Sequence, residues 1–358
     1  MKILSKIRLF VIFIILSMLF SCERGGNEQK LQEASNTEDD VKQPTYQKTG
    51  SIERLNDKIN DLISDNAKIE ILASGFTWSE GPLWLESENK LIFTDVPENK
   101  IYQWSPGDTE ASVYLTPSGY TGESEHGGES GANGLILDTE NNLVLCQHGD
   151  RQLAKMTAPI SSPAAEFEAI VTNWEGKKFN SPNDLVLGSK GIYYFTDPPY
   201  GLPKPNREGD KEIDFQGVYS VRDGIATLEY KDLERPNGVA LSPDETKLYV
   251  ANSHGKRPIW MVFDVDEAGH LSNGKVFFDA LALSKTAKGM PDGLKVDNAG
   301  NLFATGPGGV LVFSPEGEHL GTIKTGQATA NCAFNADKSI LYMTADMHLM
   351  RLVLKPKA

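Results

Sequence analysis

Short apolar runs alternate with tight polar turns from about residue 67 to residue 356. One unit has apolar residues at 239–241, a turn at 242–245, and further runs at 247–251 and 258–263. Equivalent runs recur before and after it, rich in β-branched and aromatic residues and bounded by Gly, Pro, Asn and Asp. Runs of this length and composition predict strands joined by turns. The chain is therefore expected to be all-β.

The units share one turn, in which a polar or acidic residue precedes a strand. The turns are Ser79-Glu80-Gly81-Pro82, Ala132-Asn133-Gly134-Leu135, Ser181-Pro182-Asn183-Asp184-Leu185, Arg235-Pro236-Asn237-Gly238-Val239, Met290-Pro291-Asp292-Gly293-Leu294 and a degenerate Ala330-Asn331-Cys332-Ala333. Successive copies are 53, 50, 54, 55 and 39 residues apart. Repeats of roughly 40–50 residues are typical of four-stranded propeller blades. Six units predict a six-bladed β-propeller over residues 67–356.

The two segments before the propeller differ from it in composition. Residues 1–21 begin with three cations and continue into an apolar run, as in a secretory signal. The segment ends at Leu19-Phe20-Ser21-Cys22, which resembles a bacterial lipobox and predicts acylation of Cys22. The alternative is an ordinary signal peptide that happens to be followed by a cysteine. Export as a lipoprotein would anchor the protein in the cell envelope, in the outer membrane facing the periplasm.

Residues 22–50 are polar and contain almost no large apolar side chains, so we expect a disordered tether. Residues 51–66 carry Ile52, Leu55, Ile59, Leu62 and Ile63 at helical spacing. This spacing predicts a short amphipathic helix packed on the propeller.

Charge and cysteine content narrow the range of partners. The formal net charge is −14, and it becomes −17 without residues 1–21 and their three cations. Nucleic acid and anionic membrane surfaces are therefore disfavoured, and membrane contact is expected only through the lipid. Cys146 and Cys332 lie in apolar strands, so two buried free thiols are favoured over a disulfide. Nothing implies an obligate protein partner.

The repeated turns also predict a metal site. Equivalent residues of a propeller converge on its axis, so Glu80, Asn183, Asn237 and Asp292 are expected to meet. Two carboxylates and two amide oxygens suit one hard divalent cation, with Ca²⁺ favoured. Zn²⁺, Mg²⁺ or Mn²⁺ can use the same oxygens. Taken singly, each Asn-Gly or Asp-Gly pair is more simply a turn signal, and only their registration across units favours ligands.

Seven motifs in order, from Ser79-Glu80-Gly81-Pro82 to Pro291-Asp292-Gly293, resemble the regucalcin/gluconolactonase family, and most closely its bacterial gluconolactonase branch. The others are residues 131–135, 146–151, 179–185, 195–201 and 235–238. The resemblance covers about residues 65–354. It implies a six-bladed propeller that holds one Ca²⁺-type ion and hydrolyses sugar lactones. The family's metal ligands correspond to Glu80, Asn183, Asn237 and Asp292.

Hydrolysis of a lactone requires a polarised carbonyl and an activated water, both of which a divalent cation can supply. Asp292 is the favoured general base, because it can contact both ion and water. Asn133 and His148 are candidate substrate-binding residues, although Asn133 could simply close its turn and His148 could be structural. Ser181 replaces an arginine of the animal members, which leaves the identity of the lactone open.

Two insertions, residues 118–132 and 202–216, read either as lids or as plain surface loops. Two other functions remain open at this stage. One is hydrolysis of non-sugar lactones or esters, and the other is a non-catalytic, metal-stabilised binding propeller on the envelope.

Overall fold

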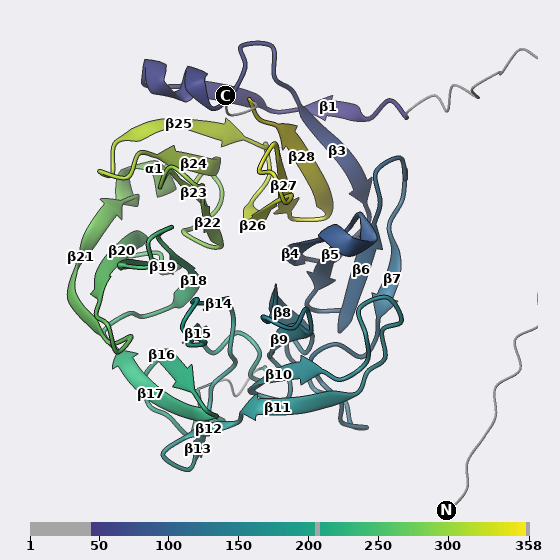
Figure 1. Cartoon of the computed structure of the whole chain (residues 1–358), viewed down its shortest axis with the longest axis vertical. Helices are drawn as coiled ribbons and strands as arrows, with labels where there is room; N and C mark the ends of the chain where they lie inside the picture. The colour runs from purple at the N-terminus through teal and green to yellow at the C-terminus, as the bar shows by residue number, and fades with distance from the viewer. Residues whose placement is uncertain (1–43, 205–207, 356–358) are drawn as a thin grey trace, which may run out of the picture. The chain divides into compact units, whose positions relative to one another are not determined.

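Six antiparallel sheets surround a common axis in the computed structural model, which describes residues 44–204 and 208–355 (Figure 1). The innermost strands are β4, β8, β14, β18, β22 and β26, as Figure 1 shows. The first three blades consist of β4 (Ser79–Leu85), β5 (Lys90–Asp95), β6 (Lys100–Trp104) and β7 (Ser112–Leu115); β8 (Ala132–Leu137), β9 (Leu143–Gln147), β10 (Gln152–Met156) and β11 (Phe167–Val171); and β14 (Leu185–Leu187), β15 (Tyr193–Asp197), β16 (Gly217–Arg222) and β17 (Ile225–Tyr230). The predicted six-bladed propeller is confirmed.

The remaining blades follow in chain order. They consist of β18 (Pro236–Leu241), β19 (Lys247–Asn252), β20 (Ile259–Val265) and β21 (Leu271–Asp279); β22 (Leu294–Val296), β23 (Leu302–Gly306), β24 (Gly309–Phe313) and β25 (His319–Lys324); and β26 (Thr329–Phe334), β27 (Ile340–Ala345), β28 (His348–Val353) and β3 (Ile69–Ser74). Short elements outside the blades are the hairpin β12 (Asn173–Trp174) and β13 (Lys177–Lys178), the helix α1 (Leu281–Ser284) and the 3₁₀ turn Glu86–Glu88. No helix in the described part of the chain is long and apolar enough to cross a membrane.

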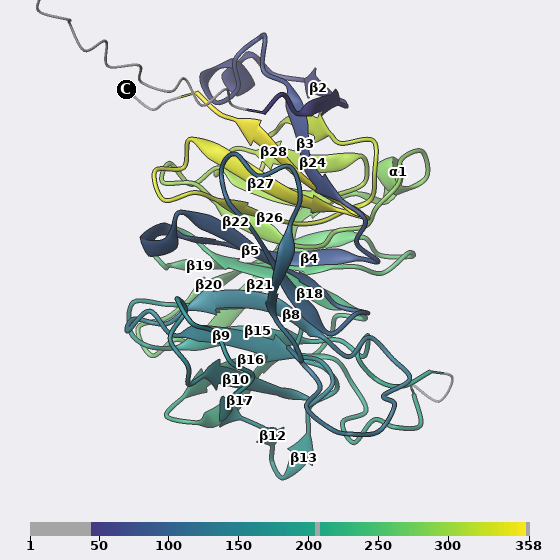
Figure 2. The same cartoon turned by 90° about the vertical axis from the view of Figure 1, so that its right-hand side faces the viewer.

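The sixth blade takes its fourth strand, β3, from near the beginning of the described chain. Strand β3 pairs with β28, with Arg351 opposite Glu70, and the two strands lie side by side in Figure 2. This pairing closes the ring, because the first and last parts of the described chain share one sheet. A closed ring of sheets leaves only short outer edges exposed.

The segment before β3 differs from its prediction. Strand β1 (Gln47–Thr49) pairs with β3, and β2 (Ser51–Arg54) pairs with β25. Only a 3₁₀ turn, Asp57–Asp61, remains of the helix that the sequence predicts over 51–66. The outer edges of two blades offer unpaired backbone groups, so short extended segments add to them instead of forming a tether or helix. The predicted signal segment, Cys22 and tether residues 22–43 lie outside the described residues.

Hydrophobic packing occurs between neighbouring blades. Each of six buried clusters joins two adjacent sheets; one contains Leu91 and Phe93 from the first blade with Tyr342 and Leu349 from the last. Ile59 and Ile63, from the segment before β3, are fully buried in the cluster between the fifth and sixth blades. Cys146 and Cys332 are buried free thiols, as predicted.

Candidate metal centre and active site

The repeated turns lie where the innermost strands begin, and most of them contain a β-bulge. The pairing register shifts between Glu80 and Leu83 in β4 and between Pro236 and Val239 in β18. The same shift occurs in β8 and β26. A bulge adds a residue to one strand and re-aims the side chains beside it. In these four strands, the repeated turn of the sequence therefore coincides with a β-bulge.

A polar side chain at the end of the second strand holds the turn in three blades. Asp95 accepts hydrogen bonds from the N–H groups of Thr77 and Trp78, at 2.9 and 3.1 Å. In the third blade, Asp197 accepts from the N–H groups of Asn180 and Ser181, both at 2.8 Å. In the fourth, Asn252 Oδ1 accepts from the N–H of Arg235 at 2.8 Å. These bonds fix the backbone before Glu80, Asn183 and Asn237. Asp197 therefore caps a turn.

Adjacent turns are also bonded to one another around the ring. The Gly134 N–H donates to the carbonyl of Asn183 at 2.7 Å, and Thr196 Oγ1 donates to the carbonyl of Asn237 at 2.6 Å. A Cβ on Gly238 would lie 2.2 Å from the carbonyl oxygen of Asp292, so only glycine allows this approach. The glycines thus let neighbouring turns approach closely, which is a different role from hairpin formation.

The same contacts correct the alignment of the sixth turn. Gly293 N–H donates to the carbonyl of Ala330 at 2.8 Å, as Gly134 does to Asn183. Ala330, and not Asn331, therefore occupies the position of the polar turn residue. The Asn331 side chain instead bonds to Asp184, which follows Asn183 in the third repeated turn. The sixth blade consequently offers no side-chain oxygen at the ring position.

All four predicted metal ligands line a single cavity of about 470 Å³, and Asn133 lines it with them. Glu80, Asn133, Asn183 and Asn237 are each at most 5% exposed. The structure therefore brings together the residues that the sequence repeat selected, from five different blades.

Three buried oxygen atoms of the cavity could act as ligands of a cation. Glu80 Oε2, Asp292 Oδ1 and Asn133 Oδ1 have no hydrogen-bond partner among the described residues. No Lys, Arg or His is among the described residues that line the cavity. Buried acceptors without donors are costly, so a ligand that supplies positive charge fits this donor set. Among the described residues no three Asp, Glu, His or Cys side chains converge to hold a metal; an ion here would need the amide oxygens as well.

The protein alone disfavours ionisation of the two acids. Burial, followed by the charge of Asp184, raises the pKa of Glu80 to about 8. Burial, followed by the charges of Glu80 and Asp184, raises the pKa of Asp292 well above its usual value. A cation between the two carboxylates would oppose both effects, because opposite charge favours the ionised form.

His148, a candidate substrate-binding residue, is not among the described residues that line the cavity. It is fully buried, and its Nε2 lies 3.5 Å from Nδ2 of Asn183. The backbone of Gly201 covers it, since a Cβ there would lie 2.6 Å from His148 Cβ. His148 thus contacts the side chain of Asn183, a candidate metal ligand.

Ser181 has a structural role at the position where animal members have arginine. Its Oγ donates to the carbonyl of Pro198 at 2.5 Å and accepts from the N–H of Gly201 at 2.9 Å. These bonds fix the segment that carries Tyr200, which lines the cavity.

Several wall residues lie outside the repeated pattern. Trp78 donates from Nε1 to Glu80 Oε1 at 3.4 Å. Glu129, Tyr200 and Ser253 also line the cavity. Glu129 comes from the 118–132 insertion and Tyr200 from the 195–201 motif, so the sequence analysis singled out both segments. Their individual roles were not, because none repeats between blades.

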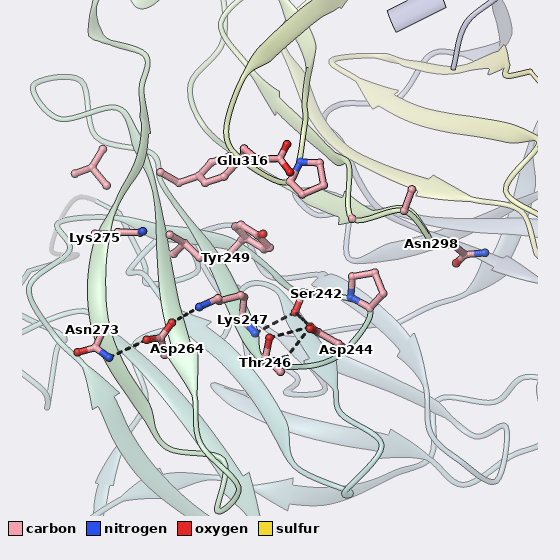
Figure 3. Close-up of a pocket in the computed structure, with 17 residues that line it drawn as sticks. Ser242, Asp244, Thr246, Lys247, Tyr249, Asp264, Asn273, Lys275, Asn298 and Glu316 are labelled. Carbon is pink, nitrogen blue, oxygen red and sulfur yellow. Dashed lines mark hydrogen bonds and ion pairs between the residues drawn. The ribbon is translucent and has the colours of Figure 1, made fainter. Parts of the chain in front are cut away.

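A larger cavity, of about 680 Å³, lies elsewhere on the fourth and fifth blades (Figure 3). Asp244, Thr246 and Lys247 line it, in or beside the turn that follows β18. The candidate ligands lie at the opposite ends of the innermost strands. Several of its polar groups already pair with one another: Asn273 Nδ2 donates to Asp264 Oδ2 at 2.7 Å and Lys247 pairs with Asp264 (Figure 3). None of the predicted site residues lines it.

Comparison with known proteins agrees with this geometry. Residues 78–346 match the family described as "SMP-30/Gluconolactonase/LRE-like region". A gluconolactonase from Zymomonas mobilis is 37% identical over 310 residues, covering 85% of this chain and 86% of the relative. A solved gluconolactonase structure from Xanthomonas campestris is 30% identical, with a TM-score of 0.74 over 87% of this chain and 99% of the other. A regucalcin from Agrobacterium tumefaciens, described as calcium-binding, has a TM-score of 0.60 at 16% identity over 80% of this chain and 96% of its own, which shows the shared fold.

Proposed function

The chain belongs to the SMP-30/gluconolactonase/LRE-like family, and from this premise we propose that it is a metal-dependent hydrolase of sugar lactones. The observation that carries the metal dependence is a pair of carboxylates, from buried Glu80 and partly buried Asp292, each with one buried oxygen that has no partner among the described residues. The 37% identical gluconolactonase supports the substrate class.

We assign one divalent cation to Glu80, Asn183, Asn237 and Asp292. Calcium is the proposed ion, because all four donors are oxygens and the cavity leaves room for water ligands. When bound, such an ion polarises an ester carbonyl and lowers the pKa of a nearby water.

Asp292 is assigned as the general base. Its Oδ1 lines the cavity without a partner in the described chain, so it can accept a proton from an attacking water. The Asn237 side chain bonds the same carboxylate and holds it in place. The short Asp side chain restricts the base to one position, whereas Glu80 is longer and is assigned to the ion alone.

The remaining residues orient the substrate and exclude water. Trp78 and Tyr200 supply flat apolar faces for a sugar ring, and the Tyr200 hydroxyl is bonded to Ser253. Asn133 presents a free amide oxygen to substrate hydroxyl groups. Ring opening releases an aldonate, and like charge from the cavity acids favours departure of that product.

Turnover of glucono-1,5-lactone, corrected for spontaneous hydrolysis, tests the proposal. Activity should disappear with EDTA and return with Ca²⁺. In Asp292→Asn, saturating metal should leave kcat lower by roughly 10²–10⁴-fold, because the base is lost. Near-normal kcat in that saturated variant would make Asp292 a ligand only. No turnover with any added divalent ion would favour a binding propeller instead.

A further inference from the structure

Three threonines near the ends of second strands link neighbouring turns of the ring, and all three are fully buried. Each donates from Oγ1 to a carbonyl of the next blade: Thr94 to Asn133 at 3.2 Å, Thr196 to Asn237 at 2.6 Å and Thr305 to Ala330 at 2.8 Å. Of the three acceptors, only Asn237 is assigned to the metal. The hydroxyl of Thr196 is therefore the one that joins a neighbouring blade to a proposed ligand.

This link is a property of particular blades and not of the fold in general. By the pairing register, the equivalent positions in the second and fourth blades hold Cys146 and Ala251, which have no hydroxyl. In the sixth blade, Thr344 bonds within its own blade, to the carbonyl of Asn331 at 3.2 Å.

Thr196 contacts the backbone of both asparagines that are assigned to the ion. Its carbonyl accepts from the N–H of Asn183 at 2.8 Å, and its hydroxyl donates to the carbonyl of Asn237. The same hydroxyl accepts from the N–H of Asp184 at 3.3 Å. One residue thus joins the third and fourth turns, and Asn183 and Asn237 both line the cavity.

Asn237 relies on this contact because it lies outside the regular pairing of its strand. The register of β18 with β19 passes from Pro236 to Val239, which leaves Asn237 in the β-bulge. The Asn237 side chain also bonds to Asp292. Movement of the Asn237 backbone would therefore displace one proposed ligand and disturb a hydrogen bond of another.

We propose that Thr196 is a positioning residue of the metal site: its hydroxyl fixes the spacing between Asn183 and Asn237 and thereby raises the affinity for the divalent cation. The inference rests on the proposed metal-dependent lactonase function. Thr196 is assigned no contact with the substrate, so its effect should appear in metal binding and not in the reaction of the metal-loaded protein.

Four variants of the full chain test the proposal. Thr196→Val keeps the branched shape without the hydroxyl, Thr196→Ser keeps the hydroxyl, and Thr196→Cys replaces it with a thiol, a weaker donor. Thr344→Val is the matched control, because Thr344 is also fully buried and bonded to a backbone carbonyl, but its blade holds none of the four assigned ligands. Isothermal calorimetry gives the Ca²⁺ affinity of each protein. The thermal midpoint, and kcat on glucono-1,5-lactone at saturating Ca²⁺, are measured beside it.

Thr196→Val should bind Ca²⁺ about 10-fold more weakly than wild type, because the buried carbonyl of Asn237 loses its donor. Thr196→Ser should stay within about 2-fold of wild type, with Thr196→Cys between the two. At saturating Ca²⁺, kcat of all three should stay within about 2-fold of wild type, since the reaction itself is not altered. Thr344→Val should lower the thermal midpoint but leave Ca²⁺ affinity unchanged.

Wild-type Ca²⁺ affinity in Thr196→Val, or an equal loss of affinity in Thr344→Val, would overturn the assignment of Thr196 while the proposed metal site stands. A weakened Thr196→Ser would assign the effect to the methyl group and would overturn it as well. If Thr196→Val does not fold, wild-type affinity in Thr196→Cys decides against the proposal. If wild-type protein binds no divalent ion and hydrolyses no lactone, the proposed function fails and this inference fails with it.

Discussion

At the scale of single residues, the charge of the cavity acids links metal binding to proton release. Glu80 and Asp292 are acids, buried and partly buried respectively, whose ionisation the protein disfavours and a cation favours. Without an ion, each acid must either hold a proton or carry an unpaired charge, and an unpaired buried charge is unfavourable. Metal binding and proton release should therefore be coupled.

This coupling predicts how stability varies with pH. Glu80 has a pKa of about 8 in the folded, metal-free protein, against 4.5 for the unperturbed group. An acid whose pKa is raised by folding favours the folded state below its unfolded pKa and loses that contribution as pH rises through the folded value. The thermal midpoint of the metal-free protein should thus fall between about pH 4.5 and pH 8. Calorimetric scans in EDTA across this range measure it.

The same argument predicts that added Ca²⁺ raises the midpoint more at pH 8 than at pH 5. Glu80→Gln is the control, because removal of the titrating carboxyl should flatten the metal-free profile. A metal-free midpoint that increases steadily up to pH 8 would contradict the raised pKa.

At the scale of elements, the bulged turn is the unit that links sequence to site. The polar residue of the turn lines the cavity. Its glycine lets the backbone of the next blade approach closely. In three blades, a side chain at the end of the second strand accepts hydrogen bonds from the backbone of the turn. The requirement for glycine is steric at Gly238, because the carbonyl oxygen of Asp292 occupies the space of a Cβ.

Gly238→Ala should therefore lower stability and disturb the adjoining turn. Overpacking of this kind costs about 1–3 kcal/mol, and Ca²⁺ affinity should fall with it because Asn237 and Asp292 both move. Gly255→Ala, in the same blade, is the matched control, since its nearest neighbour would be Met290 Cε at 3.6 Å. Urea unfolding and calcium titration compare the two. Equal effects would show that the close approach at Gly238 is unimportant.

The N-terminal strands yield a second prediction at this scale. Tyr46 is buried, and its hydroxyl donates to the carbonyl of Asp108 at 3.0 Å. Its ring also lies 5.0 Å from the Arg351 guanidinium. A protein that begins at residue 51 loses this residue and β1, so its thermal midpoint should be several degrees below that of a protein that begins at residue 44. Both should remain soluble and active. Identical midpoints would mean that β1 adds nothing to the sixth blade.

These elements show what the sequence could and could not predict. The strands of every blade follow from apolar runs and turn residues, and the axial residues follow from their shared position before a strand. The register of the sixth turn was misassigned, because Ala330 has no polar side chain and Asn331 resembled the missing ligand. The added strands β1 and β2 escaped prediction because short polar segments gain their pairing only from an edge that the rest of the fold creates. His148 looked like a pocket residue because nothing in the sequence shows that Gly201 covers it.

At the scale of the whole molecule, the ring closes through a strand from near the start of the described chain, while the expected export signal precedes that strand. We propose that the propeller is held at the envelope by acylated Cys22, with the residues up to 43 as its tether. Globomycin should block maturation, and labelled fatty acid should appear on the wild-type protein but not on Cys22→Ser. Cys22→Ser protein that still partitions to membranes would contradict the anchor.

Residues from four blades are proposed to hold one divalent cation at the propeller axis. Isothermal calorimetry of Ca²⁺ binding to the soluble propeller, at pH 8, tests it most directly with wild type, Glu80→Gln and Asp292→Asn. Both substitutions remove an acid whose ionisation the protein disfavours, so folding should be preserved and is verified by the thermal midpoint. The account predicts one ion per wild-type chain and affinity at least about 10-fold weaker in each variant. Unchanged affinity in both variants, or no binding of Ca²⁺, Zn²⁺, Mg²⁺ or Mn²⁺ by wild type, would contradict it.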